Sequence, residues 1–284
     1  MARNPRFEQV SPEVGELDET AVEEGLNDDP DETMAMLADL TAATDPRLRE
    51  LARRLAARLY LDVSRRGPVR PRGIGKITSL PFTPDGGDLD IDASIDAIAE
   101  ARGGHMALDP SRLRVRGWAK PGTALCLMVD RSGSMGGKPL ATSAVAAAAV
   151  AWRAPQDYSV LAFGKDVVVA KSQDVFKESD RVVNDVLSLR GFGTTDVAGA
   201  LRTAQMQLMR STAGRRIAVL LSDCRQTVDG DAVAAAAALS ELLIIAPAGD
   251  SDEADRLAAA VGAKIGYATG PSTVAAVLTQ LLDD

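Results

Sequence analysis

Residues 124–137 read ALCLMVDRSGSMGG, an apolar run of strand length that ends on Asp130 and is followed by a short polar turn. In an open α/β sheet, ligands bind at the carboxyl ends of the strands, because the loops there line the crevice between helices. Ser132 and Ser134 follow the aspartate at alternate positions. Three short oxygen-bearing side chains, with no histidine or cysteine beside them, suit a hard cation such as Mg²⁺ or Mn²⁺. The stretch therefore predicts a metal-binding turn at a strand end.

The order of Asp130, Ser132 and Ser134 resembles the DxSxS signature of von Willebrand factor A (VWA) domains. In that family a threonine and a second aspartate complete a metal-ion-dependent adhesion site. Residues 191–201, GFGTTDVAGAL, look like the threonine loop and offer Thr195. Residues 217–223, IAVLLSD, look like the strand that ends on the second aspartate, Asp223. The resemblance covers roughly residue 114 to the C-terminus and leaves the first third of the chain unexplained.

The resemblance implies a metal ion, Mg²⁺ or alternatively Mn²⁺ or Ca²⁺, held by Asp130, Ser132, Ser134, Thr195 and Asp223. Neutral hydroxyl ligands, with the aspartates acting partly through water, leave much of the charge of the ion uncompensated. The ion then attracts an external carboxylate, which in this family is typically a Glu or Asp of a partner protein. We therefore expect a non-enzymatic protein-binding module, in which Asp196 forms hydrogen bonds within its loop rather than binding metal.

Other interpretations of the same residues are weaker. The serines could merely cap the following helix. An aspartate at the end of a first strand is also the nucleophile of haloacid-dehalogenase-type phosphatases, but Ser132 stands where those enzymes have a second aspartate. Residues 136–139, GGKP, lack the upstream glycine and the following Ser or Thr of a P-loop, so any ATPase must be a partner. Cys224 has no histidine base nearby in the sequence, and His105 has no companions of a catalytic triad.

Short apolar strands alternate with helices after residue 137, which predicts an α/β, doubly wound, mainly parallel sheet flanked by helices, as in Rossmann-like and VWA folds. The expected strands are 158–163, 167–170, 217–222, 242–247 and 264–267, and the expected helices are 140–152, 180–189, 197–209, 231–239, 252–261 and 273–282. The strands over 158–163 and 167–170 are expected to form an antiparallel hairpin at the sheet edge. Residues 113–118 alternate like a further edge strand.

Charge divides the first third of the chain. Residues 1–45 carry thirteen acidic side chains against Arg3 and Arg6, so we expect a largely disordered, solubilising arm. Folded structure is expected to begin near residues 31–40. The alternative role for the arm is docking or autoinhibition. Residues 46–116 are predicted to be a helical accessory segment and linker, and residues 117–284 the VWA domain. This leaves a small helical region before the sheet.

A basic amphipathic helix is predicted from Pro46, with leucines at positions 48, 51, 55 and 59 and five arginines around them. Such a helix usually packs on its own domain with solvated arginines, but it could bind nucleic acid or a membrane. The aspartates of residues 88–96 lack the glycine and glutamate of a calcium-binding EF-hand loop, and a capped helix start explains them better.

The segments before residue 124 resemble those preceding the VWA domain in magnesium-chelatase D-type and CoxE-like proteins. In that group the VWA protein is the partner of a MoxR-type AAA+ ATPase. The resemblance implies an adaptor that takes part in protein remodelling or metal-cofactor maturation.

Composition agrees with a globular protein, since 46% of the 284 residues are hydrophobic and the net charge is −8. This charge argues against general nucleic-acid binding. Neither a signal peptide nor an apolar run long enough to cross a membrane stands out, so we expect a cytoplasmic protein without membrane contact. Both Cys126 and Cys224 are expected to be reduced and buried, with a single disulfide between them as the alternative.

Overall fold

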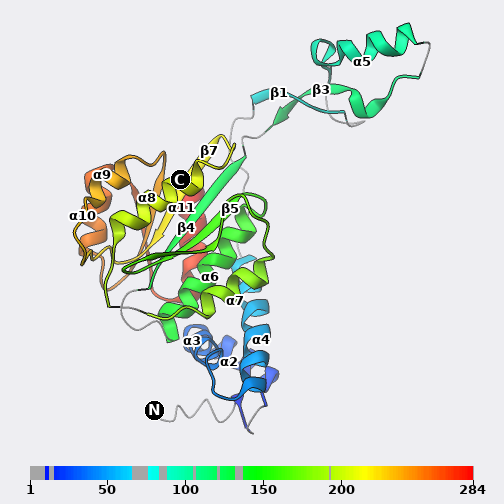
Figure 1. Ribbon diagram of the computed structural model, residues 1–284. Helices are drawn as coiled ribbons and strands as arrows, with labels where there is room; N and C mark the ends of the chain where they lie inside the picture. Colours follow the sequence, from blue (N-terminus) through cyan, green and yellow to red (C-terminus); the bar gives the residue numbers. More distant parts are fainter. Residues whose placement is uncertain are drawn as a thin grey trace. The chain divides into compact units, whose positions relative to one another are not determined.

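The structure is a computed structural model that describes residues 10–12, 16–65, 76–82, 88–104, 107–119, 122–131, 137–191 and 193–283. The chain forms two compact units. Unit 1 is drawn from Met1–Arg70 and Thr123–Asp284, and unit 2 is Pro71–Gly122. The second unit is thus inserted into the sequence of the first. Figure 1 shows the elements of both.

A six-stranded sheet forms the centre of unit 1, in the order β6-β5-β4-β7-β8-β9. Its strands are β4 (Thr123–Asp130), β5 (Tyr158–Phe163), β6 (Val167–Lys171), β7 (Arg215–Leu221), β8 (Leu242–Pro247) and β9 (Lys264–Ala268). Edge strand β6 runs antiparallel to β5, and the other neighbouring strands pair in parallel. The predicted α/β fold, its mainly parallel sheet and its edge hairpin are confirmed.

Helices cover both faces of this sheet. They are α6 (Gly137–Arg153), α7 (Ser179–Leu187), α8 (Val197–Leu208), α9 (Ala232–Ala237), α10 (Asp252–Val261) and α11 (Pro271–Asp283). Because side chains alternate along a strand, β4 serves two cores. Leu125 and Leu127 face α6, α7 and α11, whereas Cys126 and Met128 face α8, α9 and α10. This double burial explains why β4 reads as one continuous apolar run.

N-terminal helices form a further layer of unit 1 outside α6, in which α3 and α4 pack against α6 and α2 packs against α3. They are α2 (Glu19–Asp28), α3 (Pro30–Leu40) and α4 (Pro46–Arg65). The prediction of a largely disordered arm over residues 1–45 is therefore wrong for residues 19–40, while residues 1–9 and 13–15 lie outside the described chain. The physical reason is that the acidic side chains cap helices: Asp18 accepts from backbone N–H groups of α2, and Asp29 does so for α3.

Apolar residues on α3 and α4 bury this layer against the rest of unit 1. Met34, Leu37 and Leu40 are buried, as the prediction of folded structure near residues 31–40 requires. On α4, Leu48 and Leu55 are buried as well.

The arginines of α4 lie around this apolar stripe, and Arg58 forms an ion pair with Glu19 of α2 at 2.7 Å. The interpretation of the basic helix as packed on its own domain is confirmed.

In its described residues, unit 2 contains a small antiparallel sheet of order β1-β3-β2 and the helix α5. Its elements are β1 (Lys76–Pro81), β2 (Asp88–Leu89), α5 (Ile91–Gly103), a 3-10 helix (Pro110–Arg112) and β3 (Arg114–Ala119). The strand predicted over 113–118 is thus the middle strand of this separate sheet and not an edge strand. Because β3 pairs with β1 and β2, the sheet of unit 1 begins at Thr123, later than the domain start predicted at residue 117. The accessory segment predicted over residues 46–116 is divided between the two units.

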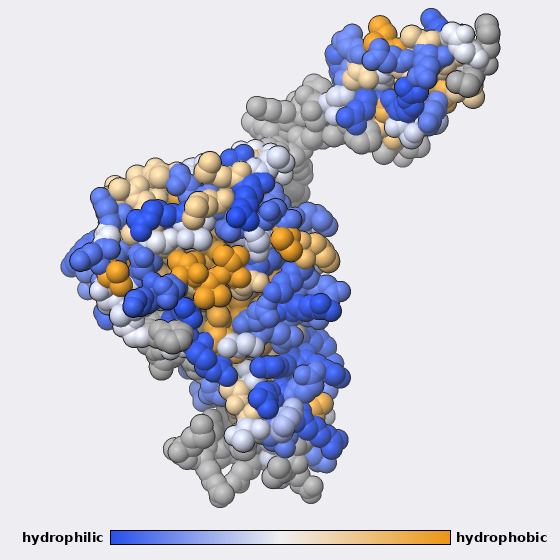
Figure 2. All heavy atoms as spheres, viewed as in Figure 1, coloured by the Kyte–Doolittle hydropathy of each residue, from blue (hydrophilic) through white to orange (hydrophobic). Residues whose placement is uncertain are grey.

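No helix among the described residues is both long enough and apolar enough to cross a membrane. Unit 1 is mainly hydrophilic on the face shown in Figure 2, with a broad apolar patch, coloured orange, near its centre.

Candidate metal centre

Two adjacent strand ends meet at the carboxyl edge of the sheet. β4 ends on Asp130, and its neighbour β7 is followed by Ser222 and Asp223. Val129 pairs with Leu221, so the residues that follow these two positions lie side by side. The Ser222 hydroxyl donates to Asp130 Oδ2 at 2.5 Å. This bond ties the first predicted metal ligand to the strand that carries the last one.

The turn after β7 is held by its own hydrogen bonds. The Cys224 N–H donates to Ser222 Oγ at 2.8 Å, and the Arg225 N–H donates to Asp223 Oδ1 at 3.0 Å. Cys224 takes a left-handed backbone conformation with a φ of 63°, which is uncommon for a residue other than glycine. A turn constrained in this way fixes the direction of the Asp223 carboxylate.

Asp130 and Asp223 line the same pocket, which has a volume of about 400 Å³. Its other walls come from the first turns of α6, including Lys138 and Ser143, and from the connection between β9 and α11, including Gly270. The two carboxylates that the sequence predicts as metal ligands are therefore brought together.

Thr195 lies in the loop before α8, is buried, and is not among the residues that line this pocket. Its N–H donates to Thr227 Oγ1 at 2.8 Å, and its carbonyl accepts from the Thr227 N–H at 3.0 Å. Thr227 belongs to the connection that follows Asp223, so the two loops are joined. Asp196 accepts from the Gly199 N–H at 2.7 Å and caps α8, which confirms that it forms hydrogen bonds within its loop.

Ser132 and Ser134 lie outside the described residues. Within the described ranges, no three His, Cys, Asp or Glu side chains gather where they could hold a metal ion. A cation at this pocket would thus depend on hydroxyl oxygens in addition to Asp130 and Asp223. An oxygen-only donor set with two carboxylates fits a hard divalent cation.

Sequence reasoning missed Ser222 as a residue of this site. The sequence does show a serine directly before Asp223 at a strand end. Its contact with Asp130 could not be predicted, because the two residues are 92 positions apart in the sequence.

Neither cysteine is suited to be a nucleophile. Both are free thiols and both are buried, so the expectation of reduced cysteines is confirmed. Burial raises the pKa of Cys126 to about 12, and burial together with the neighbouring Asp223 and Asp130 raises the pKa of Cys224 to about 12. Thiols with such pKa values stay protonated near neutral pH, whereas the thiolate is the reactive form.

Comparison with protein families identifies the class that this fold and site define, a VWA domain protein. The family model described as "VWA domain containing CoxE-like protein" matches residues 51–265. The chain belongs to this family of CoxE-like VWA proteins. The matched range includes most of α4, all of unit 2 and the main sheet as far as the start of β9. VWA domains are in general interaction modules without catalytic activity.

Solved structures of low identity are similar to part of this chain. Proximal thread matrix protein 1 from the mussel byssus is 12% identical, with a TM-score of 0.45 over 57% of this chain and 48% of that one. The von Willebrand factor type A structure from Catenulispora acidiphila is 15% identical, with a TM-score of 0.44 over 59% of this chain and 43% of that one. The manganese-loaded TRAP protein of Plasmodium vivax is 15% identical, with a TM-score of 0.45 over 57% and 74%.

This chain thus spans somewhat less than half the length of the first two structures. No curated protein matches it.

Proposed function

We propose that this protein is a divalent-metal-dependent protein-binding module. Asp130, Ser132, Ser134, Thr195 and Asp223 are the ligands of Mg²⁺, or alternatively of Mn²⁺ or Ca²⁺. The observation that carries the proposal is that Asp130 and Asp223, which are 93 positions apart in the sequence, line one pocket at the carboxyl edge of the sheet. When bound, the cation supplies a positive centre that a Glu or Asp of a partner protein can approach.

The residues of the chain itself hold this site in place. The Ser222 hydroxyl donates to Oδ2 of Asp130 and so orients this carboxylate. The Arg225 N–H orients Asp223 in the same manner. Because these donors are fixed by the turn after β7, the carboxylates need little rearrangement when a ligand arrives, which lowers the entropic cost of binding.

The partner we propose is a MoxR-type AAA+ ATPase, with this protein as its adaptor in protein remodelling or metal-cofactor maturation. Membership of the CoxE-like family supports this partner, and so does the resemblance to the magnesium-chelatase D group. We propose no nucleic-acid or membrane partner, because the apolar stripe of α4 is buried and the net charge is −8.

An affinity pull-down from native lysate tests the proposal. The wild-type protein is compared in Mg²⁺ and in EDTA, beside Asp130→Ala and the control Asp229→Ala, an exposed aspartate in the same connection as Asp223. We expect an AAA+ ATPase to be retained in Mg²⁺ by the wild type and by Asp229→Ala, and to be lost in EDTA and with Asp130→Ala. Retention of the same proteins in all four samples would show that the metal is not the recognition element.

A phosphohydrolase that uses Asp130 is the second candidate, because Lys138 lines the same pocket and could bind a phosphate. It predicts release of phosphate from an aryl phosphate in Mg²⁺. Turnover by the wild type equal to that of Asp130→Ala would remove this candidate.

A further inference from the structure

An exposed groove lies between the edge strand β6 and helix α8. Lys165 and Val167 of the β5–β6 hairpin line one side of it, and Arg202 and Met206 of α8 line the other. Its volume is about 590 Å³. The apolar patch of Figure 2 lies over the region in which Figure 1 labels β4, β5 and α8. The groove is distinct from the metal pocket, because the residues that line the two are different.

The side of the groove that β6 forms is apolar. Val167 and Val169 pair with Phe163 and Leu161 of β5, whose side chains lie in the core beneath α8. Cross-strand partners point to the same face of a sheet, so both valines face α8. Val169 is nevertheless 43% exposed. The groove therefore presents apolar surface that unit 1 itself does not cover.

The side that α8 forms carries apolar residues and one basic residue. Arg202, Met206 and Met209 recur at spacings of four and three residues, which places them along one face of the helix, and all three are exposed. Methionine side chains are flexible and adapt to ligands of irregular shape. Just after Met209, Arg210 donates to Ser172 Oγ at 2.9 Å, and this bond joins α8 to the segment that follows β6.

Two cations lie at the Arg202 end of the groove. Among the residues that the structure describes, neither Lys165 nor Arg202 has an ion-pair partner. Asp166 and Asp196 line the groove as well, but the Asp196 carboxylate accepts from the Gly199 N–H as the cap of α8. Two basic side chains thus stand beside one other carboxylate that has no such role. An acidic group of a ligand complements this end of the groove.

Strand β6 is at the edge of the six-stranded sheet, so its outer backbone groups pair with no other strand in the described part of the chain. Natural edge strands often carry an exposed lysine or a proline that prevents further pairing. Strand β6 has no proline, and its one lysine, Lys171, is buried and donates to the Tyr158 carbonyl. The register shifts between Val160 and Leu161, so the regular part of this edge is residues 167–169.

We propose that this groove binds an extended peptide segment of a protein partner, which adds to β6 as a further strand. In strand addition, backbone hydrogen bonds provide affinity, and pockets for alternate side chains provide specificity. The peptide has apolar side chains at alternate positions, which pack on Val169 and Met206, and an acidic residue that approaches Lys165 and Arg202. This inference goes beyond the proposed function, because none of the proposed metal ligands lines the groove.

A library of random peptides displayed on phage tests the proposal with the full chain as the target. We expect the selected sequences to alternate apolar residues and to share an acidic residue at one end. A selected peptide, synthesised with a fluorescent label, then gives a dissociation constant by fluorescence anisotropy. We expect the same constant in Mg²⁺, in EDTA and with Asp130→Ala, so this test is independent of the proposed metal site.

Variants of the groove and a matched control locate the bound peptide. Val169→Lys places a charge on the edge and should weaken binding at least about tenfold. Lys165→Ala/Arg202→Ala removes both cations and should weaken it about fivefold. Val233→Lys is the control, since Val233 of α9 is 44% exposed, and it should bind like the wild type. The amides of β6 should exchange with deuterium more slowly when the peptide is bound.

Four results would overturn the proposal. The first is a selected peptide that binds wild type and Val169→Lys equally, or a library that yields no binder. The second is a basic instead of an acidic consensus, and the third is unchanged deuterium exchange in β6. The fourth comes from sedimentation of the protein alone, because a dimer that Val169→Lys dissociates would assign this edge to a second copy of the chain.

Discussion

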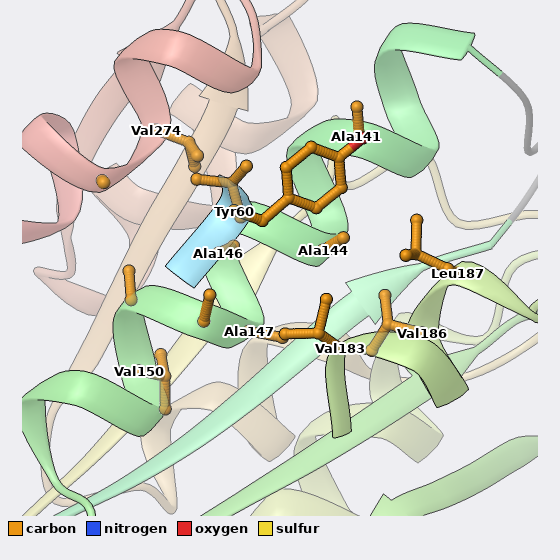
Figure 3. Close-up of a cluster of buried hydrophobic side chains, with 14 of the residues drawn as sticks. Tyr60, Ala141, Ala144, Ala146, Ala147, Val150, Val183, Val186, Leu187 and Val274 are labelled. Carbon is orange, nitrogen blue, oxygen red and sulfur yellow. The ribbon is translucent and has the colours of Figure 1, made fainter. Parts of the chain in front are cut away.

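Tyr60 should contribute several kcal/mol to the stability of unit 1, because it anchors the N-terminal helices. Its side chain is fully buried, and Figure 3 shows its ring among Ala141, Ala144 and Val274. Two substitutions separate the contribution of the hydroxyl group from that of the ring. Tyr60→Phe keeps the ring and removes only the bond to the Met34 carbonyl, which should lower the free energy of unfolding by about 1 kcal/mol. Tyr60→Ala also leaves a cavity and should cost about 3–5 kcal/mol.

Urea unfolding followed by far-UV circular dichroism measures both values, and thermal unfolding provides a check. For a unit of this size, 1 kcal/mol corresponds to a shift in Tm of about 2–4 °C. Tyr267→Ala is the control, since Tyr267 is 47% exposed and its hydroxyl donates to the surface residue Asp255. If Tyr60→Ala were no more destabilising than Tyr267→Ala, the helices α3 and α4 would not be packed on the sheet layer as described, and the reasoning would be refuted.

The remaining predictions concern the thiols and the start of α6. Because the folded pKa of Cys126 and of Cys224 is about 12 and the ordinary value is about 9, only the unfolded thiols ionise above pH 9, and stability should fall as pH rises from there toward 12. Each thiol should contribute about 1.4 kcal/mol per pH unit to this loss of stability. Urea unfolding at a series of alkaline pH values should therefore show that the free energy of unfolding of a Cys126→Ala/Cys224→Ala variant falls less steeply with pH than that of the wild type. Equal slopes would contradict this prediction. Gly137→Ala should destabilise by about 1 kcal/mol through its left-handed backbone alone, because an added Cβ would come no closer than 3.8 Å to Asp39. Gly249→Ala, with open space and no positive φ, is the control and should be neutral within about 0.5 kcal/mol; equal destabilisation by both variants would contradict the role of backbone conformation.

Local patterns were sufficient to predict the elements of the VWA sheet. Strand β8 and helix α10 occur at their predicted bounds, because short apolar runs alternate with helices that have clear ends. The positions of Asp130 and Asp223 were also predictable, since each stands at or just after the end of a buried strand, whereas their role as metal ligands stays a prediction.

Features that depend on contacts between distant residues were not predictable in this way. The charge of residues 1–45 indicates disorder, yet Asp29 caps α3 and Asp31 contacts α11, so these charges form part of the folded unit. The alternating pattern of β3 is the same for an edge strand of the main sheet and for the middle strand of a separate sheet. Its pairing with β1 and β2 could therefore not be predicted from the pattern. The bond between Ser222 and Asp130 likewise arises only when β4 and β7 lie side by side.

The insertion of unit 2 affects how the chain can fold during synthesis. Helix α4 ends at Arg65, but α6, against which it packs, ends only at Arg153. At typical rates of translation, the intervening chain takes roughly 4 to 18 s to synthesise. During that time the apolar stripe of α4 has no sheet layer to cover it, so the nascent chain exposes a basic amphipathic helix. Unit 2 is fully synthesised before the first strand of the main sheet, and the N-terminal helices can pack only after α6 has been synthesised.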